Sequence, residues 1–318
     1  MKDNLYSNGV ASALSTTLLT SDLYSRLIDA KGAEEALSIL SETSFGSSSV
    51  NASQSVAVTK EEIIKSELCK LVNFIKAESP TQNFLQVLML PYDYLNIATF
   101  IKCAGDSSFD SIVEIEGCYS LNKIKEFIQS KNYAFFNNKY IQNALEEVDS
   151  ISTSQSGWEV DFILKKYLYK NLSELSKKEK TLKEIVSNKI DCENLSVCLR
   201  ARTRFELESQ LLSGGKLDKK VFVMIFEKNS SSLNSIQNEH LKKLAKIVLE
   251  GTNYSKFEVL RNSLEINLLQ DLKYNIESIA PFAYYVYKKL ADIKNVRLIL
   301  SYQENGLKDK IKNKLLGV

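Results

Sequence analysis

The sequence contains the stretch Asp191-Cys192-Glu193-Asn194-Leu195, and its pattern, Asp-x-x-Asn followed by an apolar residue, occurs at two other places. The other copies are Asp93-Tyr94-Leu95-Asn96-Ile97 and Asp292-Ile293-Lys294-Asn295-Val296. Their aspartates lie 98 and 101 positions from Asp191. The first two copies also agree downstream, where Gly117 lies opposite Gly215. Because solenoid units repeat every ~20–50 residues, this longer spacing predicts one body built from three related modules.

The composition favours helices throughout the chain. Its 318 residues include only 3 prolines and 11 glycines, whereas average usage would give about 16 prolines. A chain poor in both helix breakers and rich in Leu, Lys, Glu and Ile is typical of helical proteins. We therefore predict an all-α fold with modules at 1–90, 91–189 and 190–318, the third containing a long C-terminal helix.

Local patterns place several helices and their ends. Apolar residues recur every three or four positions in the windows 64–75, 160–175 and 257–276, which predicts helices with one buried face. Two runs that resemble buried strands, 221–226 and 296–300, are interpreted as helix turns. The reason is that position 222 lies opposite Ile124, within a helix-like segment.

Four residues have the chemistry of helix caps. Thr59 with Glu62 predicts a capping box, Pro281 suits the first turn of the last long helix, and Gly306 suits its C-terminal cap. The Ser-rich stretches 44–54 and 150–157 predict loops.

Several classes of site are disfavoured. The five cysteines show no C-x-x-C spacing and His240 is the only histidine, so we predict no metal site and no cofactor. Gly214-Gly215-Lys216 lacks the remainder of a Walker motif and predicts a turn between helices. The net charge of +2 gives no overall drive toward nucleic acid. No apolar run approaches 18 residues, so no membrane span is expected.

The Asp-x-x-Asn pattern has two interpretations. Asp and Asn near a helix start cap free N–H groups, and this structural role is the preferred one. Contact with a partner protein is the alternative. A similar choice applies to the basic cluster Arg200, Arg202 and Arg204, where Arg200 and Arg204 are expected on one helix face. These arginines either bind an acidic partner or pair with Glu206 and Glu208.

Several segments together resemble one family, the C subunit of prokaryotic A/V-type rotary ATPases, called the d subunit in eukaryotes. The segments that carry the resemblance follow one another in the family's order: Tyr6-Ser7-Asn8-Gly9-Val10, Thr43-Ser44-Phe45-Gly46, Asp191 to Ala201, Ala283-Tyr284-Tyr285, Asn295-Val296-Arg297 and Asn305-Gly306-Leu307. The resemblance spans nearly the whole chain.

The resemblance implies a funnel-like body of three pseudo-symmetric helical modules. Such a subunit would carry out no chemistry. It would link the central shaft, made of D- and F-type subunits, to the membrane proteolipid ring, and it would transmit torque for H⁺ or Na⁺ transport. It would lie at the cytoplasmic face of the membrane as a peripheral part of the complex. The alternatives are a helical scaffold for unrelated partners and a helical enzyme of the isoprenoid type, although the paired acidic clusters of the latter are missing.

Eight residues are predicted to contact partner proteins, and no catalytic residue is predicted: Asn96, Lys102, Asn194, Arg200, Arg202, Arg204, Asn295 and Arg297. Trp158 opens an amphipathic segment and is expected in the core. His240 and the lysines of 308–314 are expected on solvated surfaces.

Overall fold

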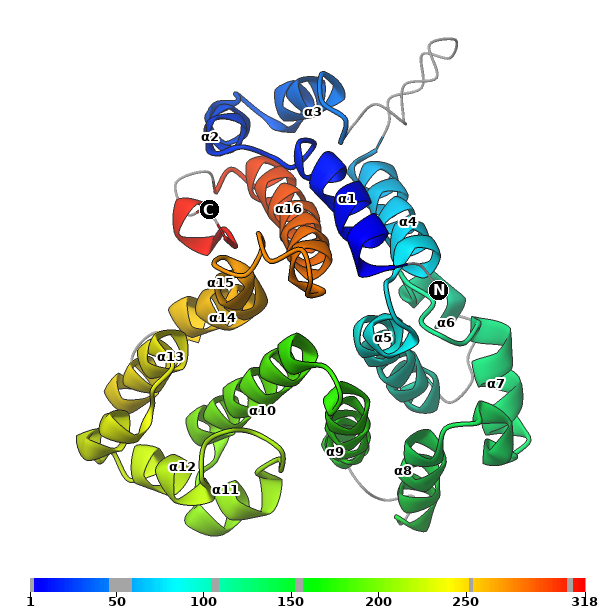
Figure 1. The fold of residues 1–318 in the computed structure, drawn as a ribbon, viewed down its shortest axis with the longest axis vertical. Helices are drawn as coiled ribbons and strands as arrows, with labels where there is room; N and C mark the ends of the chain where they lie inside the picture. Colours follow the sequence, from blue (N-terminus) through cyan, green and yellow to red (C-terminus); the bar gives the residue numbers. More distant parts are fainter. Residues whose placement is uncertain are drawn as a thin grey trace. The chain divides into compact units, whose positions relative to one another are not determined.

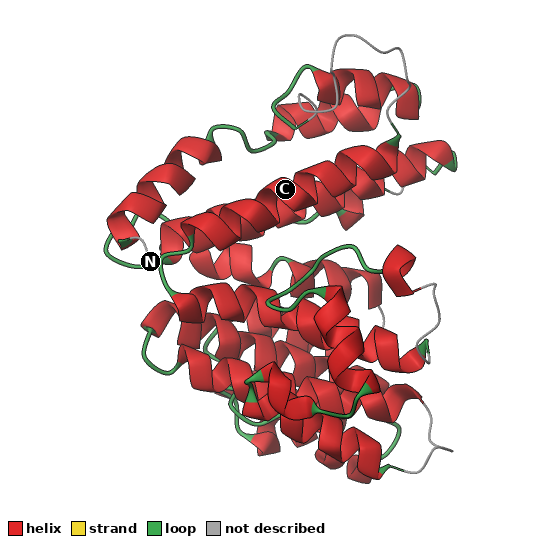
Figure 2. Cartoon of the chain, turned by 90° about the vertical axis from the view of Figure 1, so that its right-hand side faces the viewer, coloured by secondary structure: helices red, strands yellow, loops and turns green. Residues whose placement is uncertain are grey.

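The computed structural model describes residues 3–45, 59–103, 109–151, 157–251, 254–307 and 311–317. Every regular element within these ranges is an α-helix or a 3₁₀-helix, so the predicted all-α class is confirmed (Figure 2). The chain forms two compact units, one made of residues 1–80 and 250–318 and the other of residues 81–249. The predicted loop stretches 44–54 and 150–157 fall mostly outside the described residues.

The first unit is organised around one long helix, α16. Its elements are α1 (Asn4–Ser15), α2 (Ser21–Asp29), α3 (Ala33–Ser41), α4 (Lys60–Glu78), α14 (Tyr254–Asn262), α15 (Leu264–Leu269), α16 (Ala280–Glu304) and η4 (Lys312–Lys314). Helices α1, α3, α4 and α15 pack on α16 (Figure 1). Within this interface Lys289 of α16 and Glu67 of α4 form a buried ion pair, with 2.7 Å between Nζ and Oε2.

The second unit is built on α9 and α10. Its elements are α5 (Gln82–Lys102), α6 (Phe109–Ile112), α7 (Leu121–Gln129), η1 (Tyr133–Phe136), α8 (Lys139–Ser150), α9 (Gly157–Ser176), α10 (Lys180–Arg200), α11 (Arg204–Gln210), α12 (Lys219–Phe226), η2 (Ser230–Ser235) and α13 (Glu239–Glu250). Helix α9 packs against α5, α8 and α10, while α10 also packs against α11 and α12 (Figure 1). Most of α10 is therefore buried, including polar residues near its middle.

The predicted helix ends agree with the structure. Thr59 and Glu62 form a capping box at the start of α4. Pro281 lies in the first turn of α16, and Gly306, with a φ of +65°, follows its C-terminus. The strand-like run 221–226 lies in α12, and 296–300 lies in α16, so both interpretations as helix are confirmed.

The window 257–276 is not one helix, and here the sequence prediction was wrong. Helix α14 ends at Asn262, and α15 begins at Leu264 after the turn residue Ser263. The Ser263 hydroxyl donates to the Val259 carbonyl, a local bond with which serine competes with regular helix geometry. Beyond Leu269 the chain forms turns, which leaves Leu272 and Ile276 exposed.

Helix α5 alone among the described helices is long and apolar enough to span a membrane by length and composition. In the structure 61% of its apolar window is buried, and the helix packs on α9. It also carries the buried polar residues Asp93 and Asn96. The apolar sequence of α5 is thus accounted for by its place in the core of the second unit.

Candidate partner-binding site

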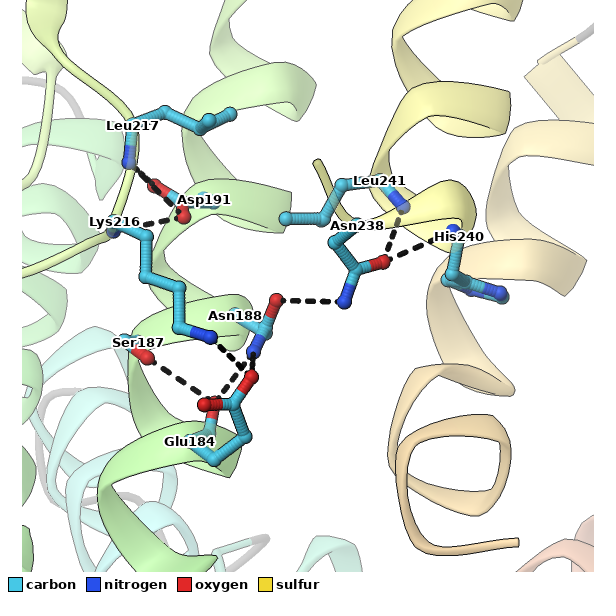
Figure 3. Close-up of polar contacts among 9 residues, drawn as sticks. All are labelled: Glu184, Ser187, Asn188, Asp191, Lys216, Leu217, Asn238, His240 and Leu241. Atoms are coloured by element: carbon cyan, nitrogen blue, oxygen red, sulfur yellow. Dashed lines mark hydrogen bonds and ion pairs between the residues drawn. The ribbon is translucent and has the colours of Figure 1, made fainter. Parts of the chain in front are cut away.

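The Asp-x-x-Asn copy of α10 binds the backbone of the loop that leads into α12 (Figure 3). The fully buried Asp191 carboxylate accepts hydrogen bonds from Lys216 N, at 2.9 Å, and from Leu217 N, at 3.3 Å. Asn194 bonds Leu212 in both directions, donating to its carbonyl at 3.0 Å and accepting from its N–H at 2.8 Å. We call this arrangement the α10 clamp.

The copy of α5 repeats this arrangement, which we call the α5 clamp. Asp93 accepts from Cys118 N at 2.8 Å and from Tyr119 N at 3.0 Å, and Asn96 donates to the Ile115 carbonyl at 2.9 Å. Gly117 lies against the Asp93 carboxylate as Gly215 lies against that of Asp191, too close for a Cβ atom at either position. The sequence equivalence of the two glycines therefore reflects one shared contact.

The copy of α16 forms the α16 clamp from two distant segments. Asp292 accepts from Leu19 N at 3.0 Å and from the Tyr24 hydroxyl at 2.7 Å. Asn295 bonds Leu316 in both directions, at 2.9 and 2.8 Å. Leu19 immediately precedes the N-cap of α2, just as Tyr119 and Leu217 precede the N-caps of α7 and α12, so the three aspartates bind their partner segments at the same position.

The pattern was interpreted as a helix cap. The aspartates do bind free N–H groups, but they do not lie at the start of their own helices. They lie in the middle of long helices and bind the backbone of a different segment. Burial raises the pKa of Asp191 to about 6, because it outweighs the bonds from Lys216 and Leu217. The pKa of Asp292 is raised for the same reason, against the bonds from Leu19 and Tyr24.

A network at the start of α10 adds to the α10 clamp. Glu184 forms an ion pair with Lys216 and accepts from Asn188 at 2.9 Å (Figure 3). Asn188 in turn accepts from Asn238, at 3.2 Å, and the Asn238 side chain caps α13 by binding the N–H groups of His240 and Leu241. Helix α10 is thus tied by polar contacts to both the loop before α12 and the start of α13.

The second unit has a groove between α9, α10 and α11, which we call the Trp158 groove. It encloses about 370 Å³, and its apolar lining comes from Trp158 and Phe162 of α9, Val197 of α10 and Leu212. A neighbouring cavity of about 480 Å³ shares Trp158 and Phe162. The groove is therefore a concave surface with aromatic walls, large enough to accept side chains of another molecule.

Most acidic groups around the Trp158 groove are already satisfied. Asp161 pairs with Lys102 at 2.5 Å, and Glu193 pairs with Lys165 at 2.8 Å. Glu206 accepts from the backbone N–H of Arg202 at 2.9 Å. The local carboxylates consequently do little to attract a cation from outside.

Of the arginine cluster Arg200 lines this groove, and the three arginines do not lie on one helix. Helix α10 ends at Arg200 and α11 begins at Arg204, so the expectation of a shared helix face was wrong. Thr203 breaks the helix by capping α11 through the N–H of Glu206. Arg204 pairs with Glu208 at 2.7 Å and with Glu227 at 3.1 Å, which confirms intramolecular pairing for this arginine.

The other predicted contact residues divide by burial. Asn96, Asn194 and Asn295 are buried, and their amides bind the backbone of this chain in the clamps. Arg297 is exposed on α16, in the other unit from the groove. Partner contact therefore stays a prediction that concerns the exposed side chains.

Two aromatic residues of the site were not identified from the sequence. Trp158 was expected in the core, but its side chain is 56% exposed because it occupies the second position of α9, at the groove mouth. Phe205 is 84% exposed in the first turn of α11, beside the lining residue Glu206. A signal was available for Phe205, which stands among Arg202, Arg204 and Glu206 in a strongly charged segment.

The sequence profile of the ATP synthase (C/AC39) subunit family matches residues 7–314, which is nearly the whole chain. The chain belongs to this family. Membership of the C/AC39 family makes it a subunit type of V/A-type ATP synthases, in agreement with the resemblance seen in the sequence. No curated protein matches the chain. Within the described ranges of this C/AC39 family member, no group of three His, Cys, Asp or Glu side chains is placed to hold a metal ion.

Proposed function

We propose that this protein is a non-catalytic central-stalk subunit of a V/A-type rotary ATPase. In this role it links the D- and F-type shaft subunits to the membrane proteolipid ring and transmits torque for H⁺ or Na⁺ transport. It acts at the cytoplasmic face of the membrane, without a cofactor. The observation that carries the proposal is the family match over residues 7–314, and the clamps give it a physical basis.

A torque-transmitting part has to resist deformation. Close-packed helices deform little, and each clamp adds a buried, hydrogen-bonded tie between the middle of a long helix and a neighbouring loop. A hydrogen bond contributes about 0.5–1.5 kcal/mol net, and a buried polar group left without its partner costs about 1–3 kcal/mol. Sliding a loop along α5, α10 or α16 would break several such bonds at once, which supports a stiff coupling role.

The proposal is tested by affinity purification of the tagged protein from detergent-solubilised host membranes, with the bound chains identified by mass. We expect a ring proteolipid and a long coiled-coil shaft subunit to be recovered together. Recovery of neither, with the protein abundant in the soluble fraction, would contradict the proposal and would favour the helical scaffold. An ATPase assay of the isolated protein should show no turnover above that of a mock purification.

A further inference from the structure

The rim of the Trp158 groove combines exposed aromatic and arginine side chains. Trp158 and Phe205 are both more than half exposed. Arg200 lines the groove, and Arg202 is exposed in the turn between α10 and α11. Protein interfaces are enriched in Trp, Phe and Arg, and residues of these types carry much of the binding energy when they surround a pocket. The groove of about 370 Å³ with an exposed tryptophan at its edge thus has the residue types that are enriched at protein interfaces.

The two arginines differ from the charged groups around them. The Arg200 guanidinium donates through Nε to the Ser196 carbonyl at 3.2 Å, and Arg202 contributes its backbone N–H to Glu206. In the described part of the chain neither guanidinium pairs with a carboxylate, whereas Arg204 binds two. The segment is balanced in net charge, because Arg204 shares its one charge between Glu208 and Glu227 and Glu206 is a further carboxylate. Arg200 and Arg202 differ from Arg204 in that their guanidinium groups are open to a carboxylate of another molecule.

We propose that the Trp158 groove binds an acidic amphipathic helix of another subunit of the rotary complex. This inference rests on the proposed function. An apolar side chain of that helix enters between Trp158 and Phe162, and carboxylates on its flank pair with Arg200 and Arg202. Arginine forms bidentate pairs with carboxylates, and a helix presents an apolar residue and acidic residues on adjacent faces at spacings of three and four.

A cross-linking experiment on the intact complex tests this docking. The photoreactive residue p-benzoylphenylalanine replaces Phe205, the tagged chain is expressed in its host, and membranes are irradiated before solubilisation. We expect cross-linking to a helical segment of a partner subunit that carries Asp or Glu within one turn of the linked residue. The matched control places the same probe at Phe135, which is also exposed in the second unit but lies in η1; this probe should not reach that segment.

Charge reversal tests the arginines in the same assay. Arg200→Glu with Arg202→Glu should lower the yield of the Phe205 cross-link about tenfold or more, since like charges then face each other. Arg200→Lys with Arg202→Lys should retain part of it. Arg26→Glu is the control, because it reverses an exposed arginine of the other unit. Circular dichroism verifies that each variant is folded before irradiation.

The outcomes separate the inference from the proposed function. If ring and shaft subunits copurify but the Phe205 probe links to lipid, to nucleic acid or to no chain, the inference is overturned and the proposed function stands. The same holds if charge reversal leaves the cross-link unchanged. If neither ring nor shaft copurifies with the unmodified protein, the proposed function fails and the inference fails with it.

Discussion

Gly215 lies so close to the buried carboxylate of Asp191 that no side chain fits between them. The contact lets the loop before α12 present two consecutive N–H groups, those of Lys216 and Leu217, to one aspartate. Gly117 stands in the same relation to Asp93. The glycine is thus a part of the clamp, although it contributes no hydrogen bond through a side chain.

Substitution of Gly215 by alanine should destabilise the protein. The added Cβ overlaps the carboxylate of Asp191, which is buried and cannot move away without losing its bonds. Overpacking of this kind costs about 1–3 kcal/mol, which urea unfolding would measure as a lower midpoint. Gly9→Ala is the control, since it lies in α1 with no atom near its would-be Cβ. That change should stabilise by about 0.5–1 kcal/mol, and equal effects of the two changes would refute the close contact.

The pKa of Asp191 should be visible in the pH dependence of stability. With a folded-state pKa of about 6 and an unfolded value near 3.9, the folded protein binds this proton more tightly. Its contribution to stability is therefore smallest above pH 6, rises as the pH falls from about 6 to about 4, and is complete below that. The gain amounts to roughly 3 kcal/mol for two pKa units.

The difference in unfolding free energy between the wild type and Asp191→Asn isolates this group. As the pH is lowered from 7 to 4, the wild type should become more stable relative to the Asp191→Asn variant. An NMR titration of the carboxyl group should give the pKa of Asp191 directly. Glu62→Gln provides a control of opposite sign, because hydrogen bonds from Thr59 lower the pKa of Glu62. A titration of Asp191 at or below 3.9 would contradict the prediction.

Tyr24→Phe should weaken the α16 clamp. The Tyr24 hydroxyl donates to Asp292 and accepts from Asn295 at 3.2 Å, so its removal leaves two buried polar groups with fewer partners. We expect a loss of about 1.5–3 kcal/mol in the free energy of unfolding. The same change at Tyr274, which is 78% exposed, should alter stability by less than about 0.5 kcal/mol. If Tyr24→Phe lowers the free energy of unfolding no more than Tyr274→Phe does, the hydroxyl of Tyr24 contributes nothing to the clamp.

The buried ion pair of Lys289 and Glu67 should behave differently from exposed pairs. Lys289→Met leaves the Glu67 carboxylate, which is 2% exposed, with Lys70 as its one remaining ion-pair partner among the described residues. Breaking a buried pair on one side costs about 3–5 kcal/mol. Adding Glu67→Leu should recover most of the loss, and that recovery in thermal unfolding is the decisive observation. Disrupting the exposed pair of Arg26 and Glu42 should cost no more than about 1 kcal/mol.

The repeat made the clamps partly predictable. The spacing of the Asp-x-x-Asn copies, together with Gly117 and Gly215, indicated related contacts because the same close approach needs the same residue types. Which backbone the aspartates bind could not be predicted, since the partner segments lie from about 20 to more than 270 positions away. Local sequence patterns contain no information on such pairings.

The groove was harder to predict than the clamps. The position of the groove depends on where α10 ends. The sequence prediction extended one helix from Arg200 through Arg204, whereas α10 ends at Arg200. Thr203 supplied the opposing signal, as a capping residue three positions before Glu206. Trp158 was wrongly predicted to be buried. An amphipathic pattern shows which face of a helix is buried, but not which residues at the end of the helix lie beyond its packing partners.

The α16 clamp also has a consequence for the order of events during synthesis. Its contacts join Leu19 and Tyr24 to Asp292, separations of 273 and 268 residues, and Asn295 to Leu316. The second unit consists of one continuous segment, residues 81–249. On the ribosome that unit can therefore fold while the N-terminal helices still await α16. The helices near the N-terminus can therefore complete their packing only after the segment that contains Asp292 has been synthesised.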